Sequence, residues 1–420
     1  MSFLSNTARN SGARSGFLNL QSSTGNVVLD TPNFFVHTRG GSVTHLSHSL
    51  LQKVTKTRLA VQLPLINSIE SLESIRAFGK GLTEFAGLKG YPSYLSVQDA
   101  AESTPTGYHD KTGISIWPRS GRKQIEANKY ISAIEAFQPS IFQALCDGDT
   151  CADTSNKRLT KVVNRTISLL DECIKLKEAS PALKETALWG SIEGGYSVKE
   201  RIRCTEQVVS RDVDGFVLDG FHMNGPVAEE LIFQDLKPVL DSVLVLLPKH
   251  KPVLFPGPIS PLLTLQLISE GVDLFDGSYV YLVTERGGAL SFPISTDRLK
   301  VPLPCETVPV LGEFVLPQSD IKTDIRDDLS KAFEIRLVEK KYFNDPKPLL
   351  ENCICYTCRQ FSRSYIHHLL VTKELLGPML LMMHNLHHYL EFFKNIRTAI
   401  DEDQFPELVT VLKEFVVYKS

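Results

Sequence analysis

The sequence predicts an α/β protein: a (β/α)8 TIM barrel with a small zinc-binding helical subdomain near the C-terminus. Short apolar segments alternate with longer helix-periodic segments over about 250 residues, which is typical of βα units that build a parallel sheet. No glycine-rich phosphate-binding fingerprint follows any predicted strand, which disfavours the runner-up, an open doubly wound sheet. Cys353, Cys355 and Cys358 lie within six residues of one another, and three thiolates at this spacing suit a soft metal such as zinc.

The barrel is predicted to occupy residues 1–300 and to open with a β-hairpin, 14–20 and 25–29, around Gly25. A strand over residues 33–37 follows. The predicted helices are 47–54, 121–137, 157–177, 198–209, 227–243 and 260–269. The predicted apolar strands between them are 140–145, 188–192, 216–218, 253–255 and 272–275.

Residues 301–420 are predicted to form the zinc-binding subdomain and the C-terminal helices that complete the barrel. The region begins proline-rich and then becomes charged from Asp320 to Lys341. Two helices, 361–376 and 379–399, are expected after the cysteines. Gly377-Pro378 separates them, because glycine often ends a helix and proline often begins one.

His384 is the leading candidate for the fourth zinc ligand. It would lie in the second turn of the last predicted helix, and a helical hairpin could bring it back over the cysteines. His388 lies one turn further along the same helical face, so periodicity alone leaves both histidines open. His367 and His368 are expected on a helix surface, and the stripe 379–383 is expected to pack in the core. A site closed by four protein ligands predicts a structural zinc, one per chain.

The composition is that of a soluble globular protein. Of the 420 residues, 42% are apolar and 22% are charged, and the formal net charge is −3, so a nucleic-acid partner would have to meet a local basic patch. No apolar run reaches the length of a membrane span, and the N-terminus lacks the apolar core of a secretory signal. These features predict a cytoplasmic protein. The five scattered cysteines fit that compartment as buried or inert thiols: Cys146, Cys151, Cys173, Cys204 and Cys305.

Basic residues gather in three places that could contact RNA phosphates. The favoured group, Arg336, Lys340 and Lys341, precedes the cysteines; for each group a solvated helix face is the simpler interpretation. The other candidates are Arg119, Arg122, Lys123 and Lys129, and Lys157, Arg158, Lys161 and Arg165.

Several motifs resemble those of one enzyme family. Cys353, Cys355 and Cys358 are followed some twenty-five residues later by His384-Asn385, and Gly377 closes the string Glu374-Leu375-Leu376-Gly377 between them. The opening string Ser11-Gly12-Ala13-Arg14-Ser15-Gly16, with Asp30-Thr31-Pro32, and the string Gly271-Val272-Asp273-Leu274-Phe275-Asp276 add to the match. Over nearly its whole length the chain resembles the tRNA-guanine transglycosylases, in which the last string belongs to the seventh strand.

The resemblance implies that Asp276 stands at the position of the family's nucleophile, the aspartate that attacks the ribose C1′. Gly277-Ser278-Tyr279-Val280 follows it, whereas the family's enzymes have Cys and a Pro-Thr-Arg turn. The stretch 91–96 lacks the family's second aspartate and its paired glycines. Residues 214–220 are bulkier than the base-recognition loop, and Glu193-Gly194 replaces a Gln-Gly pair. The purine-reading aspartate falls nearest Cys146-Asp147. Since displacement at a glycosidic carbon needs both a nucleophile and acid–base help, these departures predict a degenerate active site without catalytic residues.

The resemblance therefore implies a non-catalytic subunit that pairs with a catalytic queuine tRNA-ribosyltransferase subunit. The heterodimer would exchange guanine for queuine at wobble position 34 of tRNAs with GUN anticodons (Asp, Asn, His and Tyr), with this chain binding and positioning the tRNA. A homodimer could form when the partner is absent, and contact with the outer mitochondrial membrane would be peripheral. The alternative is an active transglycosylase with a rearranged base pocket and Asp276 as its nucleophile.

Overall fold

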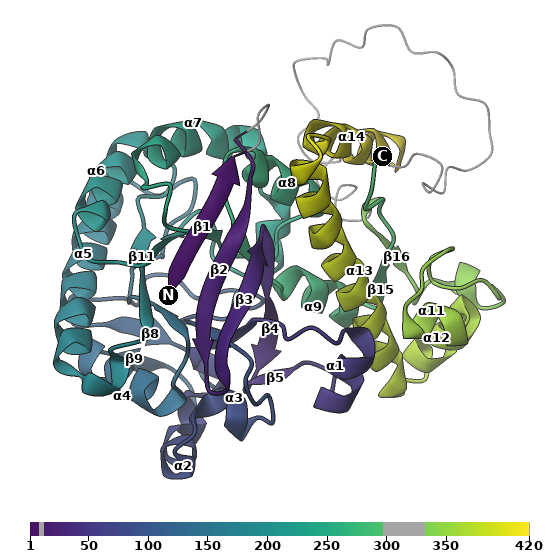
Figure 1. Ribbon diagram of the computed structural model, residues 1–420, viewed down its shortest axis with the longest axis horizontal. Helices are drawn as coiled ribbons and strands as arrows, with labels where there is room; N and C mark the ends of the chain where they lie inside the picture. Colours follow the sequence, from purple (N-terminus) through teal and green to yellow (C-terminus); the bar gives the residue numbers. More distant parts are fainter. Residues whose placement is uncertain (8–11, 297–331, 420) are drawn as a thin grey trace, which may run out of the picture.

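The computed structural model describes residues 1–7, 12–296 and 332–419, and its centre is a closed barrel of eight parallel strands (Figure 1). The strands are, in order, β4 (Asn33–Arg39), β6 (Val61–Pro64), β7 (Ser93–Ser96), β10 (Ile141–Gln143), β11 (Ala187–Ile192), β12 (Gly215–Leu218), β13 (Val253–Phe255) and β14 (Leu274–Asp276). β14 pairs in parallel with β4, which closes the barrel. The predicted TIM barrel is confirmed. The strand that ends at Asp276 is the eighth of the barrel, so its assignment to a seventh strand is wrong.

Helices cover the outside of the barrel, and most of them agree with the sequence pattern. They are α1 (His48–Val54), α2 (Leu72–Phe78), α3 (Gly81–Phe85), α4 (Ala127–Phe137), α5 (Asn156–Ala179), α6 (Val198–Val209), α7 (Phe233–Val243), α8 (Pro261–Ser269) and α9 (Ser278–Glu285). The predicted helix 227–243 is instead a short 3-10 turn, Pro226–Glu230, followed by α7. The predicted helix 121–137 begins only at Ala127, because Lys123–Ile125 forms β9, which pairs with β8 (Ile114–Ile116).

An antiparallel sheet of β1 (Ser2–Thr7), β2 (Arg14–Ser22) and β3 (Gly25–Thr31) crosses one end of the barrel (Figure 1). The predicted hairpin corresponds to β2 and β3, and β1 adds a third strand beside β2. Leu18, Leu20 and Leu29 from this sheet share one apolar cluster with barrel residues such as Tyr94 and Trp189. The sheet thus closes the amino-terminal end of the barrel, and the carboxyl ends of the strands remain for a site.

The long helix α13 (Leu376–Asp401) covers the seam where the barrel closes. Phe393 on α13 packs against Phe34 of β4 and Phe275 of β14, with ring centroids 5.1 and 5.8 Å apart. α14 (Phe405–Lys419) follows and packs on α8 and α13. A helix encoded near the C-terminus therefore completes the wall between the last strand and the first.

The remaining elements form a small layer on the far side of α13 (Figure 1). They are β15 (Gly288–Leu290), β16 (Glu334–Arg336), α11 (Tyr356–Gln360) and α12 (Arg363–Val371). The short strand β5 (Ser42–Val43) lies apart from this layer and extends β4 of the barrel. β15 and β16 pair antiparallel, and α11 and α12 both pack on α13. The predicted helix 361–376 ends at Val371, since Lys373 takes a left-handed conformation (φ 59°) that a helix does not accept. The predicted boundary at residues 300 and 301, the proline-rich stretch and Cys305 lie outside the described residues.

Candidate metal centre and barrel mouth

The structure brings Cys353, Cys355, Cys358 and His384 together, with their ligand atoms all within 4.8 Å of one another. His384 Nδ1 lies 3.8, 3.6 and 3.3 Å from the sulfurs of Cys353, Cys355 and Cys358. Ligands held by one zinc at about 2.0–2.3 Å in a tetrahedron stand roughly 3.5–3.8 Å apart. The cluster thus has the donor set and the spacing to hold a metal ion.

Local structure positions each of these ligands. Cys355 is the N-cap of α11, where its sulfur accepts the backbone N–H of Cys358 at 3.3 Å and so orients both thiols. Thr357 Oγ1 donates to the carbonyl of Leu380 at 2.8 Å, which attaches α11 to α13. His384 lies in the third turn of α13 rather than the predicted second, because the helix already begins at Leu376.

The second nitrogen of His384 is also fixed. Its Nε2 lies 2.8 Å from the carbonyl oxygen of Leu290 on β15, and only an N–H can bond there, so Nδ1 is left free to bind a metal. The next residue, Asn385, accepts the N–H of Leu290 and donates to the carbonyl of Gly288. The His-Asn pair therefore joins α13 to β15 at the metal centre.

The thiols and the imidazole of this cluster shift one another's pKa values. Hydrogen bonds from Cys355 and Cys358 lower the pKa of Cys353, whereas those with Cys353 and Cys355 raise the pKa of Cys358. Burial lowers the pKa of His384, but its bonds to Cys353 and Cys355 outweigh burial and raise that pKa to about 10. These directions place a thiolate at Cys353 beside a protonated His384, so one positive charge already lies among the sulfurs.

The other histidines lie elsewhere. His388 is buried and stacks beside His384, but it does not converge with the thiols, and burial lowers its pKa to about 3. His367 is buried with Nδ1 2.6 Å from the carbonyl of Leu337, so its predicted place on a helix surface is wrong. Met382 and Met383 are buried in the core, as predicted.

At the carboxyl ends of the barrel strands lies a small cavity of about 50 Å³. Its lining includes Tyr94, Gln143, Cys146, Asp219 and His222. Asp276, the residue at the nucleophile position, is not among the lining residues. Its carboxylate is 2% exposed and accepts hydrogen bonds from the N–H of Gly257 and from both the N–H (2.9 Å) and the hydroxyl of Ser278. Asp276 thus acts locally, as the acceptor for the first residue of α9.

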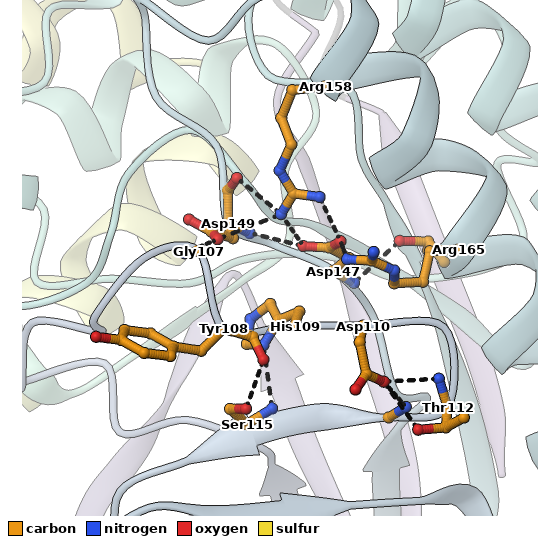
Figure 2. A network of polar contacts seen from close by, with 12 residues as sticks. Gly107, Tyr108, His109, Asp110, Thr112, Ser115, Asp147, Asp149, Arg158 and Arg165 are labelled. Carbon is orange, nitrogen blue, oxygen red and sulfur yellow. Dashed lines mark hydrogen bonds and ion pairs between the residues drawn. The ribbon is translucent and has the colours of Figure 1, made fainter.

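Asp147, the other candidate from the family pattern, also points away from the cavity. Figure 2 shows it between Arg158 and Arg165 of α5; Arg158 donates to both of its oxygens at 2.7 and 2.8 Å. The neighbouring Cys146, and not Asp147, lines the cavity. Because Arg158 and Arg165 are engaged in these ion pairs, they are not free to meet RNA phosphates as the sequence suggested.

The same network holds the segment between β7 and β8 over the barrel mouth (Figure 2). Asp149 accepts the N–H of Gly107 at 2.5 Å and a bond from Arg158 at 3.2 Å. Ser115 donates its N–H to His109 at 3.0 Å and its hydroxyl to the carbonyl of Tyr108 at 2.7 Å. His109 lines the cavity, so this segment forms part of its wall.

We expect Asp149→Asn to loosen this segment, because it weakens a charge-assisted hydrogen bond that contributes about 1.5–3 kcal/mol. Trypsin should then cleave after the exposed Lys111 about tenfold faster in the native protein, since cleavage follows the population of the open segment. The exposed Asp153→Asn is the matched control and should leave the rate unchanged. Equal rates for both variants would show that Asp149 does not hold the segment.

One polar pair at the mouth was not anticipated from the sequence. His37 Nε2 lies 2.8 Å from Asp99 Oδ1, and Asn67 donates to Asp99 Oδ2 at 2.6 Å. Burial raises the pKa of Asp99, but the charge and hydrogen bond of His37 outweigh it and lower that pKa to about 2. Asp99 follows β7 by three residues, just beyond the stretch 91–96, and pattern alone does not pair it with His37.

The fold and these sites define a class: a TIM barrel with a Cys₃His cluster beside the helix that closes it. The sequence model described as "Queuine tRNA-ribosyltransferase" matches residues 9–415. The chain belongs to this family of tRNA-guanine transglycosylases.

Relatives are similar along nearly their full lengths. The proteins named queuine tRNA-ribosyltransferase accessory subunit 2 from Ixodes scapularis and Homo sapiens are 39% and 37% identical to the chain. The matches cover 93% of this chain and 94% of the tick protein, and 94% of this chain and 95% of the human protein. The protein of the same name from Aedes aegypti is 34% identical over 99% of this chain and 92% of its own length.

Across the three described ranges, none of the helices combines the length and the apolar character that crossing a bilayer requires.

Proposed function

We propose that this protein is the non-catalytic subunit of a two-subunit queuine tRNA-ribosyltransferase. It pairs with the catalytic subunit and positions tRNAs with GUN anticodons (Asp, Asn, His and Tyr), so that guanine at position 34 is exchanged for queuine. The names of the relatives, which all include "accessory subunit", support this role. Their similarity spans the barrel and the Cys₃His segment together.

The state of Asp276 is the observation that carries the proposal. A nucleophile needs a lone pair directed at the reacting carbon, and here both carboxylate oxygens accept hydrogen bonds from Gly257 and Ser278. Moreover, Asp276 does not line the cavity at the barrel mouth. Its geometry supports a structural role in this chain and a transfer of the chemistry to the partner.

For the Cys₃His cluster we propose one structural Zn²⁺ per chain, bound by Cys353, Cys355, Cys358 and His384. Three thiolates and one imidazole form a common structural zinc site, and four protein ligands leave no position open for substrate. When bound, the zinc would link the cysteine segment to α13 and would take no part in the reaction. The cluster, α11, α12 and the C-terminal helices form the proposed second unit, residues 301–420, and residues 1–300 form the proposed barrel unit.

We propose that the partner binds the surface of this second unit. Large apolar side chains are exposed there: Phe343 (68%), Ile354 (63%), Val371 (59%) and Leu375 (82%). Apolar groups of this size are commonly covered by another subunit. Lys340 and Lys341 are exposed beside them, and we propose them for tRNA phosphates. Lys341 forms an ion pair with Glu339 that is open to solvent, whereas Arg336 is half-buried and pairs with Glu334. A homodimer through the same surface is the expected state without the partner.

We place the protein in the cytoplasm. Contact with the outer mitochondrial membrane, where it occurs, is peripheral and on the cytoplasmic face.

Exchange of labelled guanine into a tRNA with a GUN anticodon tests the proposal. The purified chain alone should show no exchange above background, the catalytic subunit alone should show little, and the mixture should show full turnover. The two chains should also copurify at micromolar concentration. Turnover by this chain alone, abolished by Asp276→Asn, would instead establish the alternative, an active transglycosylase with a rearranged pocket.

A further inference from the structure

A second cluster of possible metal ligands lies at the barrel mouth, far in sequence from the Cys₃His centre. Cys146 follows β10, Glu193 directly follows β11, and Asp219 directly follows β12. Adjacent parallel strands bring these three positions to one edge, and one ligand atom from each lies within 4.8 Å of the others. Cys146 Sγ and Asp219 Oδ2 are 3.7 Å apart, a spacing typical of two ligands on one ion.

Glu193 is the informative member of this cluster. Glu193 is fully buried (0% exposed). Within the part of the chain that the structure describes, neither of its carboxylate oxygens has a hydrogen-bond partner. The carboxylate lies against the backbone of Gly220 and near Gly148, so it is directed toward the loops that carry Asp219 and Cys146. A buried carboxylate without partners costs several kcal/mol unless something neutralises it.

The nearest buried cation does not neutralise Glu193 by contact. Arg201 gives its Nε and Nη1 to the carbonyls of Gly195 and Ile192, and its guanidinium stacks on the ring of Phe221. Its Nη2 has no partner among the described residues, and no ion pair with Glu193 forms there. Arg158 and Arg165 are engaged by Asp147 and Asp149, so they do not serve this cluster either.

We propose that Cys146, Glu193 and Asp219 bind a divalent cation of the zinc class at the barrel mouth. A thiolate with two carboxylates is a donor set that Zn²⁺ accepts, and the ion with Arg201 would balance the three negative ligands. Cys146 and Asp219 line the cavity, which gives the ion a path to the site and room for a water ligand. Gln143 orders the site, because its Nε2 donates to Asp219 at 3.1 Å and its Oε1 accepts from Tyr94 at 3.0 Å.

The test counts metal ions on the full-length chain after chelation and dialysis against micromolar Zn²⁺. The wild type should hold two ions per chain by elemental analysis, and Glu193→Gln should hold one. Cys355→Ser should also hold one, and the double variant none. The exposed Glu178→Gln is the matched control and should keep both ions. With Co²⁺ as the probe, Glu193→Gln should lose absorption of the mixed oxygen–sulfur site and keep that of the Cys₃His site.

Thermal unfolding separates a bound ion from a bound proton. If the site holds zinc, re-addition of Zn²⁺ to chelated Cys355→Ser protein raises its Tm, and the added Glu193→Gln change abolishes that rise. If Glu193 is simply protonated, Glu193→Gln raises the Tm without metal and the wild type holds one ion only. That second pattern would overturn the proposal. Neither pattern depends on base exchange, so this experiment tests the second metal site independently of the proposed function.

Discussion

We expect Cys355→Ser to remove the zinc proposed for the Cys₃His cluster, so that the zinc content falls by one ion per chain. Cys355 has two roles, as a ligand and as the N-cap that orients Cys358, and a serine hydroxyl is a poor replacement for the thiolate. A loss of about 3 kcal/mol in the free energy of unfolding corresponds, for a chain of this length, to a Tm lower by roughly 3–4 °C. Elemental analysis and calorimetry on the same preparation measure both effects.

The exposed Cys151→Ser is the matched control for thiol loss and should retain the metal and the Tm. A Cys355→Ser protein with full metal content and an unchanged Tm would show that the cluster is a set of reduced thiols. His388→Ala provides a second comparison. It should keep the metal, because His388 does not converge with the cysteines.

Asp276→Asn in this chain should reduce stability and leave base exchange by the mixed complex unchanged per folded molecule. An asparagine keeps one acceptor oxygen, but its NH₂ group would face the N–H of Gly257 or of Ser278, so one buried donor loses its partner. The expected cost is about 2–3 kcal/mol. Denaturant unfolding measures the cost, and labelled-guanine exchange with the catalytic subunit measures the activity.

The exposed Asp212→Asn is the control and should affect neither property. An active transglycosylase would respond in the opposite way. Its exchange rate would fall by several orders of magnitude while its stability stayed constant or rose, as is common when a strained catalytic carboxylate is removed.

The barrel could be predicted where the chain follows simple periodicity. The helix 198–209 was predicted with the bounds of α6, and the strand 253–255 with those of β13, because their apolar positions repeat at 3.6 residues or form a short run. β6 and β7 were missed. Gln62, Ser93 and Ser96 are buried there but polar, so they interrupt the short apolar runs of these two strands. Gln62 Nε2 donates to Ser96 on the neighbouring strand at 3.2 Å, a contact that the sequence does not reveal.

The convergence of the Cys₃His cluster could be predicted because most of its residues are close in sequence. Three cysteines within six residues converge in almost any compact conformation, and the family pattern selected His384. The bond from His384 to Leu290 spans 94 residues and has no sequence signal. Glu193 illustrates the same limit, since its isolation depends on where Arg201, Asp219 and Gly220 lie in space.

The position of α13 has a consequence for biosynthesis. This helix covers the outer face of the seam where β14 pairs with β4, so that face stays uncovered until residues 376–401 have been translated. The same helix carries His384, and the cysteines that meet it are translated just before. Docking of α13 on the barrel and assembly of the proposed metal site are therefore late steps, and a chain without the metal would lack one link between α11 and α13.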